Sequence, residues 1–256
     1  MPRKTAIFKC PIVIRILDEI EKPDQEGLFS AVKKHFPKEN VFMEKDSICI
    51  VISSDKILTA GFVFPEIDKF NAILENYGAY ALEGNSSQLS RSLSVLFNEC
   101  YQTLPIAVAV RFGAEETKRV LKYHRYTFYY TLWLAEKSMK KEIGIQDVLY
   151  LVDPAVLMIT RYDRSFGSDL RDYLYTYLLY DCNISETSRQ MYAHRNTVIY
   201  KLTQIKELIG TDWVSNPHAK HNLLSSCMIL RYVENFRKQY IDLPPIEKAL
   251  LKRTQK

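Results

Sequence analysis

Side-chain types that recognise nucleic acid are concentrated in a short stretch near the C-terminal end of the sequence. Asn196 can bond adenine through two hydrogen bonds, Arg195 can bind guanine or phosphate, and Ile199 can contact a thymine methyl group. No acidic residue interrupts this stretch before Glu207. The residues that we expect to contact DNA are His194, Arg195, Asn196, Thr197, Ile199, Tyr200, Lys201, Thr203 and Arg189.

The spacing around these residues predicts two short helices joined by a turn. Asn183 is a strong N-cap candidate, and Glu186 follows three residues later as in a capping box. The first helix is expected to carry Ile184, Ser188 and Met191 on one side, with Ser188 where two crossing helices approach closely. The turn is Tyr192–His194, and His194 or Asn196 begins the second helix.

The second helix is predicted to have an apolar inner face and a polar outer face. The inner face is Val198, Leu202, Ile205 and Ile209. The outer face is Asn196, Tyr200 and Thr203. Two short helices with such a turn form the motif whose second helix enters the DNA major groove.

The elements around this motif predict an α+β chain. Strands are expected over Ala6–Leu17, over Val41–Ile52 as two strands joined at Lys45–Asp46, and over Ile106–Phe112 as a buried strand. Helices are expected over Gln25–Phe36, Phe70–Tyr80, Ser86–Tyr101 and Glu115–Met139, and Gln146–Leu151 is read as a final strand or turn. From Asp153 onward only helices are expected: Pro154–Asp163, one started by Ser168–Asp169, Ile184–Met191, Arg195–Ile209 and Ala219–Phe236. We therefore predict an α/β domain over residues 1–152, an all-α domain over 153–240 and a basic tail over 241–256.

Composition fits a folded cytoplasmic protein. The 256 residues are 47% hydrophobic and 25% charged, and no stretch approaches the ~20 apolar residues of a membrane helix. The start of the sequence has no apolar block of the kind found in secretion signals. Residues 168–256 contain thirteen Lys and Arg against nine Asp and Glu, and so carry +4 of the net charge of +5. This excess of positive charge weakly favours an anionic partner, although a solvated basic face is the commoner explanation.

Cysteine and histidine patterns point away from metal sites and disulfides. The five cysteines are widely spread and none forms a C-x-x-C pair. His218 and His221 are the closest histidine pair, with Asp212 the nearest acidic residue. A loop-to-helix junction with two polar residues explains them better than a metal site, and no cofactor is expected.

Three runs resemble the C-terminal helix-turn-helix of the PucR/CdaR family of bacterial regulators: Cys182–Met191, His194–Leu202 with the letters H-R-N-T-V-I-Y-K-L, and Ile205–Gly210. Tyr162–Leu174 and Trp213–Val233 are similar to the flanking helices, so the resemblance covers about 75 residues. It implies a transcription regulator of catabolic genes that binds a two-fold-related operator in double-stranded DNA as a homodimer. Ile199 departs from the family, since many members have a basic or aromatic residue there.

Residues 1–150 more distantly resemble the degenerate GGDEF-like domain that often precedes this module. The matching segments are Ile106–Phe112, Tyr126–Met139 and Ile145–Tyr150. The hairpin that would hold nucleotide and metal in a cyclase is Met43–Ile48, which has Glu44 and Asp46 but no Gly-Gly and no adjacent acidic pair. No other catalytic motif is present. The sequence thus predicts a protein that is not an enzyme.

Three features of the sequence allow more than one interpretation. The aromatic residues Tyr123, Tyr126, Phe128, Tyr129, Tyr130 and Trp133 line an effector pocket or a dimer interface, or belong to the domain core, which is the commoner case. The tail Lys248–Lys256 adds phosphate contacts or is a frayed terminus. The rival function is an effector-sensing or protein-interaction module whose helix-turn-helix does not bind DNA. Burial of Asn196 and Tyr200 would favour that rival, and a basic strip across Arg189, Arg195, Lys201 and Lys206 would favour DNA.

Overall fold

The computed structural model describes residues 8–54, 62–87, 93–113, 116–142 and 148–243. These residues divide into two compact units. One comprises the described parts of Met1–Arg111 and Glu115–Trp133, and the other those of Phe112–Ala114 and Leu134–Lys256. The tail expected over 241–256 lies almost entirely outside the described residues.

The N-terminal unit is built on a five-stranded sheet with the order β2-β3-β1-β4-β5. Its strands are β1 (Phe8–Ile16), β2 (Asn40–Glu44), β3 (Ser47–Ser54), β4 (Ala79–Glu83) and β5 (Val120–Lys122). β1 pairs antiparallel with β3 and β4, β2 pairs antiparallel with β3, and β5 pairs parallel with β4. The first four strands have the order and directions of a split βαβ sheet, to which β5 adds a parallel edge strand.

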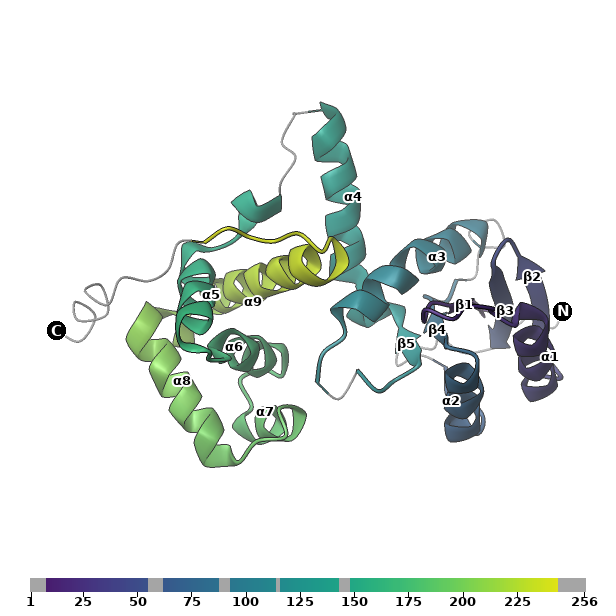
Figure 1. Cartoon of the computed structure of the whole chain (residues 1–256), viewed down its shortest axis with the longest axis horizontal. Helices are drawn as coiled ribbons and strands as arrows, with labels where there is room; N and C mark the ends of the chain where they lie inside the picture. Colours follow the sequence, from purple (N-terminus) through teal and green to yellow (C-terminus); the bar gives the residue numbers. More distant parts are fainter. Residues whose placement is uncertain (1–7, 55–61, 88–92, 114–115, 143–147, 244–256) are drawn as a thin grey trace, which may run out of the picture. The chain divides into compact units, whose positions relative to one another are not determined.

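Helices cover both faces of this sheet (Figure 1). They are α1 (Gln25–His35), α2 (Ile67–Asn76) and α3 (Leu93–Val110). Alternate residues of β1 and β3, including Ile12 and Ile50, join Leu28 of α1 and Phe70 of α2 in one buried core. α3 contacts β1 and β4 from the other face.

Several predictions for the N-terminal unit are confirmed. β1 lies within Ala6–Leu17, and α1 within Gln25–Phe36. β2 and β3 form the expected hairpin, whose turn residue Lys45 has a positive φ of 56°. The cysteines of this unit, Cys10, Cys49 and Cys100, are free thiols.

The second half of this unit differs from the sequence-based prediction. Ile106–Val110 is the last part of α3, not a strand, and Pro105 lies inside that helix. The expected helix Phe70–Tyr80 ends at Asn76, and its last residues enter β4. Glu115–Met139 includes β5 and a 3₁₀ turn at Tyr123–Arg125 before α4 (Thr127–Glu142) begins. The segment read as a final strand or turn contains a 3₁₀ turn, Val148–Leu151.

α3 is, among the described helices, the one long and apolar enough to cross a membrane. Its residues Cys100, Leu104, Ile106 and Ala107 are each at most 1% exposed, because they pack within the N-terminal unit. α3 is therefore read as the core helix of this unit.

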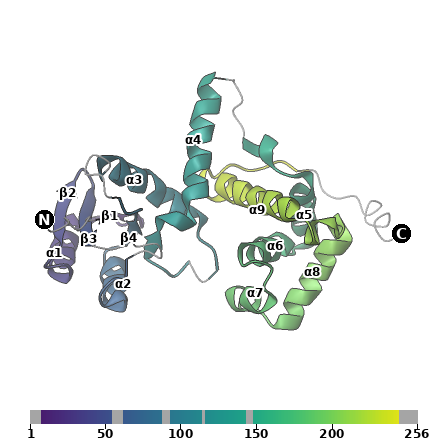
Figure 2. The ribbon, with the colours of Figure 1, turned by 180° about the vertical axis from the view of Figure 1, so that it is seen from behind.

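The C-terminal unit is helical. Its elements are α5 (Pro154–Phe166), α6 (Leu170–Leu179), α7 (Ile184–Gln190), α8 (Arg195–Ile209), a 3₁₀ turn at Asp212–Val214, α9 (Pro217–Arg231) and one π-helical turn at Tyr232–Phe236. α6 is central and contacts α5, α7, α8 and α9, as both views show (Figures 1 and 2). Together the units form an α+β chain.

The division between the units falls within α4, earlier than the boundary expected after residue 152. Leu134 and the residues after it belong to the C-terminal unit. One contact that joins the second half of α4 to the C-terminal unit is made by Glu136. This residue is 7% exposed and accepts a hydrogen bond of 2.8 Å from the hydroxyl of Tyr232.

Candidate nucleic-acid interface

The start of α6 is fixed by a carboxylate from the preceding helix. Asp163 of α5 accepts hydrogen bonds from the backbone N–H groups of Leu170 and Arg171, both at 2.9 Å, and from the hydroxyl of Ser168. A carboxylate here satisfies otherwise unpaired N–H groups and lies at the positive end of the helix dipole. Asp169, the cap that the sequence suggests, makes no capping side-chain hydrogen bond. α6 is thereby fixed to α5.

The chain reverses between α6 and α7 through two residues with positive φ, Asp181 at 52° and Cys182 at 62°. Asn183 then caps α7 as predicted, and its side-chain oxygen accepts a hydrogen bond from the N–H of Glu186 at 3.1 Å. The other half of the capping box does not form. The Glu186 carboxylate instead accepts hydrogen bonds from Arg189 and Gln190.

The buried face of α7 is rotated from the predicted one. Thr187 is fully buried and Gln190 is 9% exposed, whereas Ile184, Ser188 and Met191 are only partly buried. Thr187 suits this position because its hydroxyl donates to the Asn183 carbonyl at 2.8 Å. Ser188 donates instead to the carbonyl of Ala193 and so braces the turn.

The turn residues place α8. Tyr192 has a positive φ of 49° and a side chain that is 79% exposed. His194 is the N-cap of α8, since its Nδ1 accepts a hydrogen bond of 3.2 Å from the N–H of Asn196. Asn196 is thus the second residue inside the helix, and its side chain is not the cap.

α8 divides into the two faces that the sequence predicts, except that Ile209, at the end of the inner face, is only partly buried. Val198 and Ile205 are fully buried and Leu202 is 5% exposed. α8 contacts α5, α6 and α7, and its buried side chains form the face turned toward these helices. The opposite face is exposed at Asn196, Tyr200 and Thr203. His194, Arg195, Thr197 and Ile199 are exposed as well.

The cations near α8 are not equally available. Arg195 is exposed, and among the described residues its guanidinium donates one hydrogen bond of 3.2 Å, to the hydroxyl of Ser185. The Arg189 guanidinium lies 2.6 Å from the Glu186 carboxylate. The hydrogen bond that Arg189 donates lowers the pKa of Glu186. Lys201 is partly buried, with its Nζ 2.6 Å from Asp169. Burial lowers the pKa of Lys201, but the hydrogen bond and charge of Asp169 outweigh it and hold the pKa above its ordinary value.

The pairing of Lys201 with Asp169 was not predicted from sequence. Asp169 precedes Lys201 by 32 residues, so no local pattern joins them. Likewise, the cap by Asp163 depends on how α5 and α6 cross. Asp163 does stand seven residues before Leu170, within reach across a short link, and that is the one signal the sequence offered.

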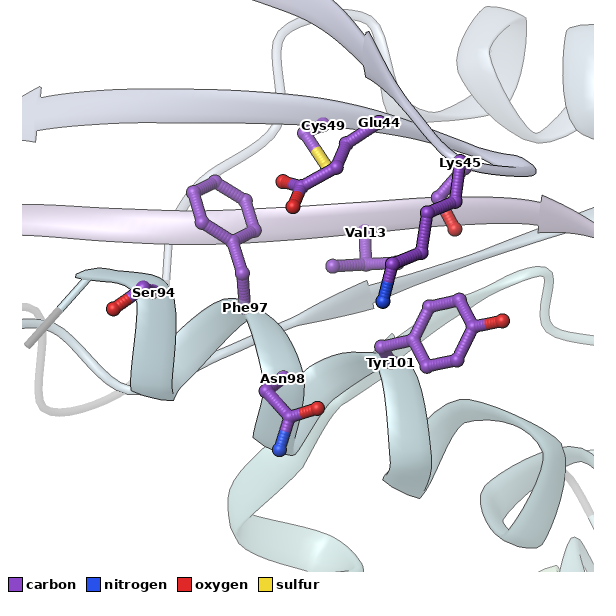
Figure 3. A pocket seen from close by; sticks show the side chains of 9 residues that line it. Val13, Glu44, Lys45, Cys49, Ser94, Phe97, Asn98 and Tyr101 are labelled. Carbon is purple, nitrogen blue, oxygen red and sulfur yellow. The ribbon is translucent and has the colours of Figure 1, made fainter.

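The β2–β3 hairpin, which would hold nucleotide in a cyclase, has ordinary structural contacts. Asp46 is paired with Arg15 at 2.7 Å, and the Arg15 guanidinium lies 4.3 Å from the ring centroid of Tyr101. Figure 3 shows the pocket beneath this hairpin, with Glu44 and Lys45 on one side and Asn98 and Tyr101 of α3 on the other. Its volume is about 100 Å³, below the roughly 300–1,000 Å³ of typical ligand sites.

One family model matches a part of the C-terminal unit. Residues 170–229 match the family described as the PucR C-terminal helix-turn-helix domain. A stretch of 48 residues is 54% identical to the purine catabolism regulatory protein of Bacillus subtilis (strain 168). This stretch is 19% of the present chain and 8% of that protein's length, so most of that protein has no counterpart in the match.

A solved structure, a regulator of polyketide synthase expression from Bifidobacterium adolescentis, is similar over 91% of this chain and 82% of its own. The sequence identity is 15% and the TM-score 0.32, too low to bear on the fold. The match to residues 170–229 runs from the first residue of α6 almost to the end of α9. The C-terminal unit of this chain therefore carries a helix-turn-helix domain of the PucR type.

Proposed function

We propose that this chain is a transcription regulator that binds an operator in double-stranded DNA, with α8 as its recognition helix. The observation that carries the proposal is the division of α8: Val198 and Ile205 are buried while Asn196 and Tyr200 are exposed, within a PucR-type domain. A helix whose polar outer face is free of packing is what entry into a major groove requires.

The residues divide between positioning and reading. Asn196 and Thr203 are proposed to reach base edges, with Ile199 and Tyr200 in apolar contact beside them. Arg195, His194 and Thr197 lie at the helix start, where contacts to the backbone phosphates are expected. Arg189 and Lys201 are proposed as weaker phosphate contacts, because each is already paired with a carboxylate.

The rival function, a sensing module that does not bind DNA, finds less support. It would be favoured by burial of Asn196 and Tyr200, yet Tyr200 is 61% exposed. The basic strip that would favour DNA, across Arg189, Arg195, Lys201 and Lys206, is interrupted, since Arg189 and Lys201 are each paired with a carboxylate. The preference for DNA binding over the rival function therefore depends on the exposed face of α8 and not on the charges around it.

The remaining parts of the proposal concern the whole protein. We propose a cytoplasmic homodimer that controls catabolic genes, in keeping with the name of the Bacillus subtilis relative. The N-terminal unit is proposed to be a non-catalytic GGDEF-like domain. The split βαβ sheet and its β2–β3 hairpin support the likeness, and the Arg15–Asp46 pair and the small pocket support the absence of catalysis.

The test measures how tightly the protein binds the DNA upstream of its own gene. Fluorescence anisotropy gives the binding constant at each of a range of salt concentrations. Each phosphate contact contributes a log–log salt slope of roughly −0.9. Arg195→Ala should therefore flatten the slope by about one contact, and Lys201→Ala by less, because Asp169 competes for its charge.

Lys34→Ala is the matched control, since it removes an exposed positive charge from α1 in the other unit. It should leave the slope unchanged. Undetectable or salt-independent binding would overturn the proposed function.

A further inference from the structure

The N-terminal unit contains a second pocket, larger than the one beneath the hairpin. It lies between the start of α2 and β5, and its volume is about 360 Å³, within the range of small-molecule sites. Its lining residues are Phe62, Val63, Phe64, Ile67, Asn71, Lys118, Val120, Lys122 and Arg125. All of them belong to the N-terminal unit.

One wall of this pocket is apolar and partly open to solvent. Val63 is 87% exposed and Ile67 is 39% exposed, although both are aliphatic. Phe62 and Phe64 line the pocket as well, with ring centroids 5.1 Å apart, and Phe64 stacks on the buried Phe70 at 5.6 Å. The wall is therefore backed by the core of the unit, and burying its surface against an apolar ligand would be favourable.

The same wall is held in place by a buried carboxylate. Glu83 is 2% exposed and accepts a hydrogen bond from the backbone N–H of Phe62. Glu83 stands opposite Lys122 in the β4–β5 pairing. Phe62 is thus tied to the last residue of β4, which helps to hold this wall in place before a ligand arrives.

The other wall is cationic. Lys118, Lys122 and Arg125 all line the pocket, and none of the lining residues in the described part of the chain is acidic. Asn71 adds one more polar group, since its side-chain oxygen is buried and has no hydrogen-bond partner among the described residues. A hydroxyl or amine on a ligand would satisfy it.

We propose that this pocket binds a small molecule with an apolar ring, a carboxylate and a hydrogen-bond donor. The ring lies against Phe62, Val63 and Ile67, and the carboxylate faces the cations of the β5 side. This site goes beyond the proposed operator binding, and its test needs no DNA, so either proposal can fail without the other.

The test uses isothermal titration calorimetry of the full chain with hydroxyphenylacetate and its neutral amide, hydroxyphenylacetamide. The two probes have the same shape and differ in charge. The carboxylate should bind at least about tenfold more tightly than the amide. The double variant Lys118→Gln/Arg125→Gln should remove that preference. Lys122 is left in place because it stands beside Glu83.

Two further variants sharpen the result. Lys34→Gln/Lys38→Gln removes the same charge from exposed positions outside the pocket and should keep the preference. Val63→Glu, at a highly exposed position, places a negative charge at the mouth and should weaken carboxylate binding. The proposal is overturned by equal affinity for the two probes, by an unchanged preference in the double variant, or by no binding up to about 10 mM.

Discussion

Single side chains decide where the helices of the C-terminal unit begin. Asn183 and His194 cap α7 and α8 from the position just before each helix, and local sequence is enough to find both. The cap of α6 comes from Asp163 in the preceding helix, and no local rule places it there. The side chain one position before the helix, Asp169, instead pairs with Lys201.

The first prediction follows from this difference. Asp163→Ala leaves two N–H groups of α6 without their acceptor and should lower the free energy of unfolding by about 1–2 kcal/mol. Asp169→Ala removes only a partly exposed ion pair and should cost less than about 1 kcal/mol. Urea denaturation monitored by Trp213 fluorescence in a Trp133→Phe background measures the free energy of unfolding. In that background Trp213 is the only tryptophan, and it is buried in the C-terminal unit. Equal costs for the two variants would refute the assignment of the cap.

Among the helices and strands, the sequence predicted best those whose hydrophobic periodicity runs without interruption along the whole element. α1, β1, the β2–β3 hairpin and α8 all lie close to their expected bounds. Ile106–Val110 misled because a short apolar run fits a buried strand or a buried helix equally, and α3 continues through Pro105 into this run. β4 was missed because Ala79, Leu82 and Glu83 favour helices, and pairing with β1 overrides that preference.

A second prediction belongs to α8 as an element. Leu202 is 5% exposed, so Leu202→Ala should lower the free energy of unfolding by about 2–5 kcal/mol. Thr203→Ala changes the neighbouring exposed position and should stay within about 0.5 kcal/mol of the wild type. The same Trp213 fluorescence assay compares them. A stable Leu202→Ala variant would mean that the inner and outer faces of α8 have been exchanged.

At the scale of the whole molecule, the predicted order of an α/β part followed by a helical part is confirmed. The division within α4 was beyond sequence reasoning, because it depends on the contact between Glu136 and Tyr232, 96 residues apart. Of the six aromatic residues around α4, Tyr123, Tyr126 and Tyr129 are at most 5% exposed, which favours the core interpretation for that half.

A third prediction concerns the chemistry of the N-terminal unit. Purified protein supplied with GTP and Mg²⁺ should form no cyclic dinucleotide, because Asp46 is engaged by Arg15 and the hairpin pocket is small. Product analysis by chromatography measures this. Product that disappears in Glu44→Ala or Asp46→Ala would show instead that the hairpin is catalytic.

If the outer face of α8 reads DNA as proposed, Asn196→Ala should weaken binding to the operator without destabilising the protein. The measurement compares the affinity of wild type and variant for the operator and for an unrelated duplex at one salt concentration. Because the Asn196 side chain is exposed and His194 is the cap, stability should stay within about 0.5 kcal/mol. Operator affinity should fall by about 1–3 kcal/mol, with affinity for the unrelated duplex unchanged. Full operator affinity in this variant, or an equal loss on both duplexes, would show that Asn196 does not read a base of the operator.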